Sequence, residues 1–197
     1  ITASHNPVEY NGIKFFNEKG LKLTDEMENL IEEYIINNMD IDFCPVSGEL
    51  GRKIPVENPL RKYMDFLKNT IDVDLTGMKI AIDCGNGAVY KPAPELLHEL
   101  GAQVYVINNE PNGININVNC GSTKPEEIQK LVLETGADAG ISFDGDADRL
   151  IASDENGNIV DGDHVLAICG TYLKEKGKLR RNTIVGTVMT NMGLDIC

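Results

Sequence analysis

The chain has 197 residues, of which 42% are hydrophobic and 25% charged, a composition typical of a globular protein of one or two domains. Its 31 acidic and 18 basic residues give a net charge of -13, which disfavours nucleic-acid binding because such a surface repels phosphates. No run of about 18 apolar residues predicts a membrane span, and no charged-then-apolar leader predicts a signal peptide. Five widely spaced cysteines without a CxxC pair favour reduced thiols in the cytoplasm over a disulfide scaffold or a zinc site.

The first predicted regular element follows an opening loop, "ITASHNPVEYNGIKFF", and is an amphipathic helix at residues 24–36. Apolar side chains recur there with the 3.6-residue period, and Thr24 or Asp25 can cap the start of the helix. The next segment contains Pro and Gly without a sustained period. We therefore expect a domain boundary near residues 45–60.

Three short apolar segments in the middle of the chain predict buried strands. They are residues 79–83, 103–107 and 139–143. A helix is predicted in each of the two intervening segments, so the order is β-α-β-α-β, which implies a parallel sheet with right-handed crossovers. The fold class that follows is α/β, with mixed or parallel sheets flanked by helices and built from βαβ repeats.

The two intervening helices carry recognisable start and stop signals. The first begins at the prolines of "PAPELLHELG" and ends at Gly101. For the second we expect a capping box of Thr123 and Glu126 at the start and Gly136 at the end.

A further unit follows the third strand. "RLIAS" at residues 149–153 predicts a strand, "DENGN" a turn, and Asp161 or Asp163 the start of a helix that Gly177 closes. Another strand is predicted at residues 182–188, and "NMGLDIC" reads as the entry to a helix. Since the chain begins inside a loop and stops inside a strand-helix unit, we expect it to be an internal piece of a longer protein.

The strongest chemical signal is the acidic loop "DGDADR", directly after the predicted strand at 139–143. Asp144, Asp146 and Asp148 alternate along it, and three carboxylates so close together repel one another unless a cation joins them. Oxygen ligands suit Mg²⁺, Mn²⁺ or Ca²⁺, and α/β sheets bind ligands at the carboxyl ends of their strands. The alternative is a solvated acidic turn.

Two further interpretations of this loop remain open. An Asp-x-Asp pair after an apolar strand also occurs in haloacid-dehalogenase-type phosphatases, although Asp148 stands where that family has Thr or Val. A non-enzymatic acidic metal-binding module is the other interpretation. Arg149, at the end of the loop, either neutralises the carboxylates or binds a phosphate oxygen through two N–H groups.

The serine loop raises a separate question, because Ser4 is either a nucleophile or a serine in an Asn-Pro turn. It lacks the Gly-x-Ser-x-Gly pattern of an α/β-hydrolase. A phosphate on Ser4 would need a cation, and one phosphate oxygen with three aspartates makes a suitable Mg²⁺ shell. Such a phosphate can pass to a sugar hydroxyl, and Lys14 is a candidate helper in that transfer, unless it is an ordinary surface lysine.

Together, "TASHNP", "NGIK" and "DGDADRL" resemble the signatures of the α-D-phosphohexomutase superfamily. The stretches "NINVNCGST" and "VGTVMTNMGLD" are similar to those of its bacterial phosphoglucosamine mutases. The resemblance covers the whole chain and implies the middle of a four-domain enzyme. Residues 1–55 would be the end of domain 1, residues 56–158 domain 2, and residues 159–197 the start of domain 3.

The resemblance also implies an activity, the interconversion of glucosamine 6-phosphate and glucosamine 1-phosphate through a phosphoserine and a bisphosphorylated sugar. A phosphomannomutase or phosphoglucomutase of the same superfamily is the nearest alternative. The partner would be a phosphorylated amino sugar, with neither nucleic acid nor membrane, and no oligomeric state is predicted. This piece alone is expected to be inactive, because the sugar-reading and phosphate-binding loops of the later domains have no counterpart in it.

The residues implied for this activity come from the two loops. Ser4 would carry the phosphate, with His5 and Lys14 as further catalytic residues. Arg149 would bind substrate phosphate. One Mg²⁺ ion per site would be held by the Ser4 phosphate together with the three aspartates, Asp144, Asp146 and Asp148.

Overall fold

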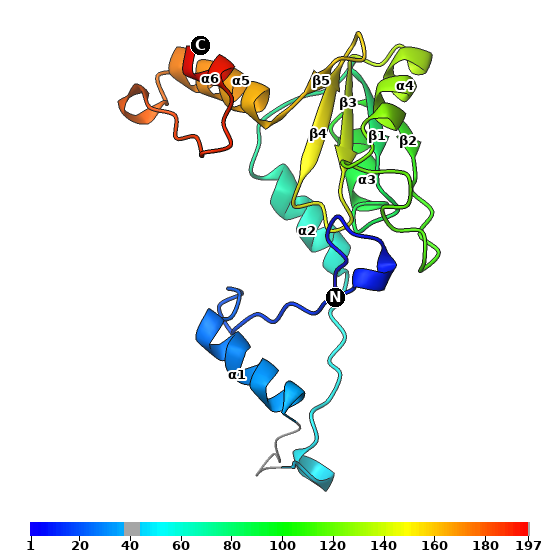
Figure 1. The fold of residues 1–197 in the computed structure, drawn as a ribbon. Helices are drawn as coiled ribbons and strands as arrows, with labels where there is room; N and C mark the ends of the chain where they lie inside the picture. The colour runs from blue at the N-terminus through cyan, green and yellow to red at the C-terminus, as the bar shows by residue number, and fades with distance from the viewer. Residues whose placement is uncertain (38–43, 197) are drawn as a thin grey trace.

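The computed structural model describes residues 1–37 and 44–196, and its centre is a five-stranded sheet (Figure 1). The strands are β1 (Lys79–Asp83), β2 (Gln103–Ile107), β3 (Ala139–Phe143), β4 (Leu150–Asp154) and β5 (Ile159–Val160). Their order in the sheet is β2-β1-β3-β4-β5. The first three strands run parallel, whereas β4 and β5 are antiparallel to their neighbours. The predicted α/β class with a mixed sheet is confirmed, and so are the three predicted central strands.

The antiparallel direction of β4 follows from the length of its connection. Only residues 144–149 join β3 to β4, and a parallel crossover needs a dozen residues or more. The predicted turn between β4 and β5 is confirmed. In this turn Asp154 Oδ1 accepts the N–H groups of Asn156 at 2.9 Å and of Asn158 at 2.7 Å.

Six α-helices surround the sheet or lie apart from it in the described part of the chain. They are α1 (Asp25–Ile36), α2 (Pro59–Lys68), α3 (Pro92–Glu99), α4 (Glu126–Thr135), α5 (Gly162–Glu175) and α6 (Met192–Ile196). Helices α3 and α4 connect the parallel strands, as the β-α-β-α-β order predicts. None of the described helices combines the length and the apolar character that crossing a membrane requires.

The core lies on both faces of β1, because successive side chains of a strand point to opposite sides. On one face Ile80 and Ile82 pack against Leu97 of α3. On the other face Ala81 packs against Ile128 of α4. Helices α3 and α4 therefore cover opposite faces of the sheet and hold the carboxyl ends of its strands in fixed positions.

The predicted capping box at α4 is wrong. The helix begins at Glu126 with Pro125 at the preceding position, and no side chain caps it. Other contacts hold the segment that contains Thr123. Ser122 N–H donates to the Phe143 carbonyl at 3.0 Å, and Lys124 N–H donates to the Gly121 carbonyl at 2.9 Å. The predicted end of α4 is confirmed, since Gly136 adopts the left-handed conformation with φ 61°.

The predicted start of α5 is confirmed, because Asp161 Oδ1 accepts the N–H groups of Asp163 and His164, each at 3.1 Å. The strand predicted at residues 182–188 is wrong. Val185 and Val188 are 84% and 101% exposed, and no strand among the described residues pairs with this segment. An apolar, β-branched segment forms a strand only where a neighbouring strand pairs with its backbone N–H and C=O groups.

The N-terminal segment contrasts with the sheet. The predicted helix is present as α1, but its apolar side chains, among them Leu30 and Ile35, are exposed. Within residues 1–37 only Ala3 is buried. The opening loop lies beside the loops at one end of the sheet, whereas α1 projects away from it (Figure 1). Polar contacts therefore have to hold the opening loop in place.

Candidate active site

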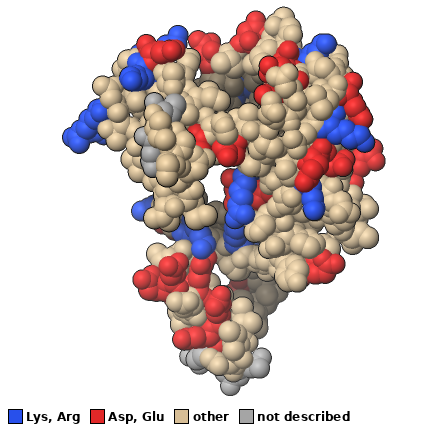
Figure 2. Space-filling view, turned by 45° about the horizontal axis from the view of Figure 1, so that its top comes forward, with Lys and Arg blue, Asp and Glu red and all other residues tan. Residues whose placement is uncertain are grey.

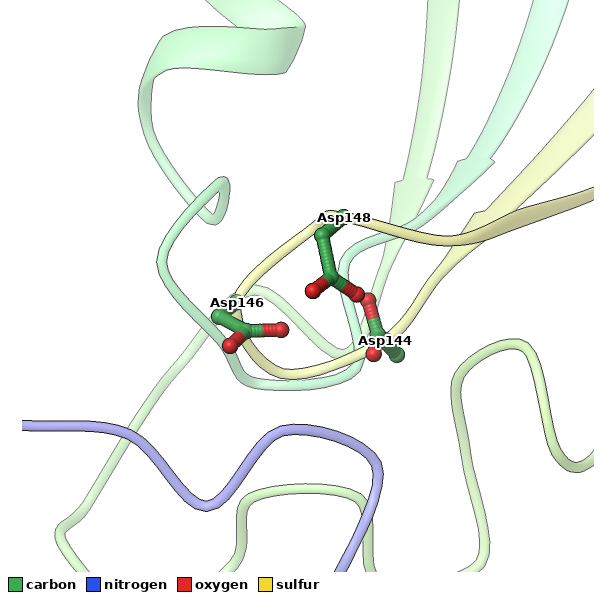
Figure 3. Close-up of side chains that lie close together, drawn as sticks. All are labelled: Asp144, Asp146 and Asp148. Atoms are coloured by element: carbon green, nitrogen blue, oxygen red, sulfur yellow. The ribbon is translucent and has the colours of Figure 1, made fainter. Parts of the chain in front are cut away.

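The acidic loop leaves the carboxyl end of β3 and brings its three carboxylates together (Figure 3). Each of Asp144, Asp146 and Asp148 offers one oxygen, and these oxygens all lie within 4.8 Å of one another. Asp144 is fully buried, Asp146 is half-buried and Asp148 is exposed. The predicted cluster is therefore present, and it opens from the interior toward the surface.

Two oxygens of this cluster lack any partner in the described structure. Asp144 Oδ2 and Asp146 Oδ1 are buried and accept no hydrogen bond. A buried, unpaired carboxylate oxygen is costly, because the charge loses water and gains nothing in return. The other Asp144 oxygen accepts the N–H of Arg149 at 3.2 Å. Two unpartnered oxygens beside a third carboxylate fit the ligand set of a divalent cation.

The surroundings move the pKa values of the two inner carboxyls in opposite directions. Burial raises the pKa of Asp144, and the charges of Asp146 and Asp148 add to that rise. Burial would also raise the pKa of Asp146. Hydrogen bonds from Thr2 and Lys14 outweigh burial there and hold the pKa of Asp146 below its ordinary value. The protein thus favours the charged form of Asp146 with its own donors, whereas burial disfavours the charged form of Asp144.

The serine loop is joined to the acidic loop, although they lie far apart in the sequence. Thr2 and Gly12 exchange backbone hydrogen bonds of 2.9 and 2.8 Å, which close the serine loop at its base. Ser4 has a left-handed conformation with φ 52°. Its carbonyl accepts the N–H of Gly145 at 3.0 Å and the Asn117 side-chain amide at 2.8 Å. Two different loops of the sheet region therefore hold this residue.

Thr2 and Lys14 make direct side-chain contacts with the aspartates of the acidic loop. Thr2 Oγ1 donates to Asp146 Oδ2 at 2.6 Å and accepts the N–H of Ser4 at 2.8 Å. Lys14 Nζ lies 3.1 Å from the same Asp146 oxygen and 4.0 Å from Asp148 Oδ2. Lys14, a candidate from the sequence, is thus placed at the acidic cluster, and its side chain is 44% exposed.

His5 and Arg149 also lie close to the serine. Ser4 Oγ is 3.4 Å from His5 Nδ1, and that nitrogen is 3.0 Å from Arg149 Nη1. Arg149 Nε is 3.8 Å from Asp148 Oδ1. His5 and Arg149 line an open hollow together with Ser122. The structure therefore brings all seven candidate residues of the sequence into one region.

Three residues that shape this region were not predicted from the sequence: Thr2, Asp83 and Asn117. Asp83 is fully buried at the end of β1 and accepts the N–H groups of Gly85 at 2.9 Å and Gly121 at 2.8 Å. A carboxylate closing a buried apolar strand before a glycine is the signal that could have identified Asp83. Thr2 and Asn117 have no comparable signal, because their partners are more than a hundred residues away.

The site carries local positive charge on a strongly acidic protein. On the face drawn in Figure 2, Lys and Arg side chains are interspersed with Asp and Glu. At the site itself Lys14 lies 3.1 Å from Asp146, and Arg149 lies 3.8 Å from Asp148. An anionic substrate can therefore approach cations at this position despite the net charge of -13.

Models of three domains of one protein family match the chain in order. Residues 1–41 match "Phosphoglucomutase/phosphomannomutase, alpha/beta/alpha domain I". Residues 61–157 match domain II, and residues 161–197 match domain III, of the same family. The serine loop therefore falls in the first match and the acidic loop in the second.

Two curated relatives and one solved structure complete the comparison. The phosphoglucosamine mutase of Alkaliphilus oremlandii (strain OhILAs) is 61% identical over 196 residues, which cover 100% of this chain and 44% of that protein. The phosphoglucosamine mutase of Acetivibrio thermocellus is 59% identical over the same shares. The chain thus spans less than half the length of these relatives. The crystal structure of a phosphoglucomutase/phosphomannomutase family protein from Burkholderia thailandensis superposes with a TM-score of 0.66 at 24% identity, covering 92% of this chain and 42% of that one, a likeness of fold.

Proposed function

The chain belongs to the phosphoglucomutase/phosphomannomutase family, and from this premise we propose that it is part of a phosphoglucosamine mutase. The whole enzyme would interconvert glucosamine 6-phosphate and glucosamine 1-phosphate through a phosphoserine and a bisphosphorylated sugar. The observation that carries this proposal is the identity of 61% and 59% to two phosphoglucosamine mutases over the full chain. The same matches favour a mutase over a haloacid-dehalogenase-type phosphatase or a non-enzymatic acidic module.

We further propose that residues 1–55, 56–158 and 159–197 are parts of three successive domains. The three matched ranges, which each fall within one of these parts, support the division. The chain covers 44% of the length of its relatives. We propose that the domains in the remaining length recognise the sugar and its second phosphate. Residues 1–197 alone are therefore proposed to be inactive.

Ser4 is proposed to carry the phosphate on Oγ. The sugar hydroxyl oxygen would attack the phosphorus, the bond to Ser4 Oγ would break, and the hydroxyl proton would pass to a base. The reverse step, on the other phosphate of the bisphosphorylated sugar, would restore the phosphoserine. Lys14 is proposed to stabilise negative charge on the transferring group, which its ammonium group, 3.1 Å from Asp146, supports.

The three aspartates of the acidic loop are proposed to hold one Mg²⁺ ion together with the Ser4 phosphate. Support comes from the two unpartnered oxygens of Asp144 and Asp146 and from the preference of Mg²⁺ for carboxylates and phosphates. A bound cation would neutralise the charge of the carboxylates and of the phosphoserine. His5 and Arg149 are proposed to contact the substrate phosphate in the hollow that they line.

A cytoplasmic location is also part of the proposal. Four cysteines in the described part of the chain, Cys44, Cys84, Cys120 and Cys169, are free thiols, as expected in a reducing compartment.

The test is made in the full-length protein that contains this chain. Ser4→Ala should abolish conversion of glucosamine 6-phosphate, because the phosphate acceptor is removed. Ser47→Ala is the matched control, since Ser47 is an exposed serine with the same φ of 52°. Normal turnover by Ser4→Ala would contradict the proposal. Equal or higher kcat/KM with mannose or glucose phosphates would instead favour the phosphomannomutase/phosphoglucomutase alternative.

A further inference from the structure

The side chain of Asn117 reaches from the loop between β2 and α4 to the serine loop. Its Nδ2 group donates to the carbonyl oxygens of Ser4 and Asn6, both at 2.8 Å. Its backbone N–H donates to the Gly85 carbonyl at 2.9 Å, which fixes the base of the side chain. Both amide hydrogens of this residue are therefore used on the serine loop.

The conformation of Ser4 needs such support. A φ of 52° is unfavourable for a residue with a Cβ atom, and it persists only where the surroundings hold it. The Ser4 carbonyl receives two donors, the Gly145 N–H at 3.0 Å and Asn117 Nδ2 at 2.8 Å. These two hydrogen bonds fix the peptide unit that follows Ser4 and limit rotation of its backbone.

The three groups also fit closely against one another. A Cβ atom at Gly145 would lie 2.5 Å from the Ser4 carbonyl oxygen and 2.8 Å from Asn117 Nδ2. The Ser4 carbonyl and the Asn117 amide therefore occupy the space that a side chain at residue 145 would need, and the two loops approach each other closely here.

We propose that Asn117 is a positioning residue, which holds Ser4 in its left-handed conformation and so directs Ser4 Oγ relative to the acidic loop. This inference rests on the proposed function, because it assigns the consequence to phosphoryl transfer from Ser4. The hollow beside the serine is lined by His5 and Arg149 and not by Asn117. Asn117 therefore acts through Ser4. Its loss should therefore lower kcat and leave KM nearly unchanged.

The test is Asn117→Asp in the full-length protein, with Asn119→Asp as the control. The first substitution keeps the size of the side chain and replaces both N–H donors by an oxygen that faces two carbonyl oxygens. Asn119 lies in the same loop, has a φ of 53° and is exposed, so its substitution makes the same charge change away from the serine. We expect kcat to fall about 10- to 100-fold with Asn117→Asp, as for a small misplacement of a reacting group, and KM to stay within about twofold.

A second readout does not depend on activity. Hydrogen–deuterium exchange of the peptide that covers residues 1–8 should rise with Asn117→Asp and not with Asn119→Asp. A kcat within twofold of the control, or equal exchange of this peptide in both variants, would overturn the inference. If Asn117→Asp does not fold, Asn117→Gly decides, because Asn117 has a φ of 58° and glycine keeps this left-handed backbone while it removes only the side chain. Unchanged kcat and exchange with Asn117→Gly would then overturn it.

The failure of the proposed function is distinguishable from the failure of this inference. A wild-type protein without mutase activity would refute the proposed function. In that case the exchange of residues 1–8 alone decides whether Asn117 holds the serine loop. An active wild type whose Asn117→Asp variant behaves like Asn119→Asp would refute only the role of Asn117.

Discussion

The two halves of the candidate site are held by different forces. The acidic loop leaves a sheet whose strands and helices bury apolar side chains such as Ile82 and Ile128. The serine loop belongs to a segment, residues 1–37, in which only Ala3 is buried. Hydrogen bonds to the sheet region hold it in place. Substitutions in the sheet should therefore change stability most, and substitutions at the contact between the loops should change activity most.

The largest effect is expected from the core of the sheet. Ile128→Ala removes a fully buried side chain that packs on β1, and it should lower the free energy of unfolding by about 2–5 kcal/mol. Ile36→Ala, at a position in α1 that is 73% exposed, should change it by less than about 0.5 kcal/mol. Urea unfolding of residues 1–197 measures both. Similar losses for the two variants would remove the contrast between the regions.

The second largest effect is expected at the contact between the serine loop and the acidic loop. Gly145→Ala places a Cβ atom 2.5 Å from the Ser4 carbonyl oxygen, so the serine loop cannot seat. Mutase activity of the full-length protein should fall about 100-fold, because a small misplacement of a reacting group has that effect. Gly162→Ala is the control, since its added methyl meets nothing within 4 Å. Activity of Gly145→Ala equal to that of Gly162→Ala would show that the contact is dispensable.

The smallest effect lies at a helix end remote from the serine loop. Asp161→Ala removes the cap of α5 and should cost about 1 kcal/mol at neutral pH, whereas Asp161→Asn should retain most of the cap. Hydrogen bonds from the backbone and ring of His164 lower the pKa of Asp161. A lowered folded-state pKa gives stability above the unfolded-state pKa, near 3.9, and that stability is lost as the pH falls through the folded-state value.

Unfolding of the wild type and Asp161→Asn at a series of pH values measures this effect. The wild type should be the more stable at neutral pH, and the difference should shrink as the pH falls below about 4. A difference that grows in acid would contradict the assignment. Neither substitution should change mutase activity, because no side-chain hydrogen bond or ion pair in the described structure links α5 to the serine loop.

Local patterns in the sequence predicted the sheet and the acidic cluster. Strands β1 to β3 are short apolar runs bounded by helix signals, and Asp144 follows the last of them directly. Helix α2 was not predicted, and the capping box at Thr123 failed because contacts with Phe143 hold that segment. Helix α2 carries a local signal that was missed, because Pro59 stands at its start and Leu60, Met64 and Leu67 follow the helical spacing. The capping box, in contrast, depends on tertiary context that a local pattern does not contain.

The same reason explains what was missed at the site. The three aspartates share one loop, so their spacing alone predicts the cluster. Thr2 and Asn117 join the serine loop to residues more than a hundred positions away, and no local spacing marks them. The prediction of a strand at residues 182–188 is the opposite case. The local pattern is suitable for a strand, but no strand of the described structure pairs with this segment.

The central claim is that Ser4 and the acidic loop form one phosphoryl-transfer site. It is tested most directly by incubating the full-length protein with glucosamine 1,6-bisphosphate carrying labelled phosphate, and mapping the label by peptide mass spectrometry. The label should lie on Ser4, and removal of the divalent cation by a chelator should prevent its appearance. Label on Asp144, as an aspartyl phosphatase would give, or no labelled residue at all, would contradict the claim.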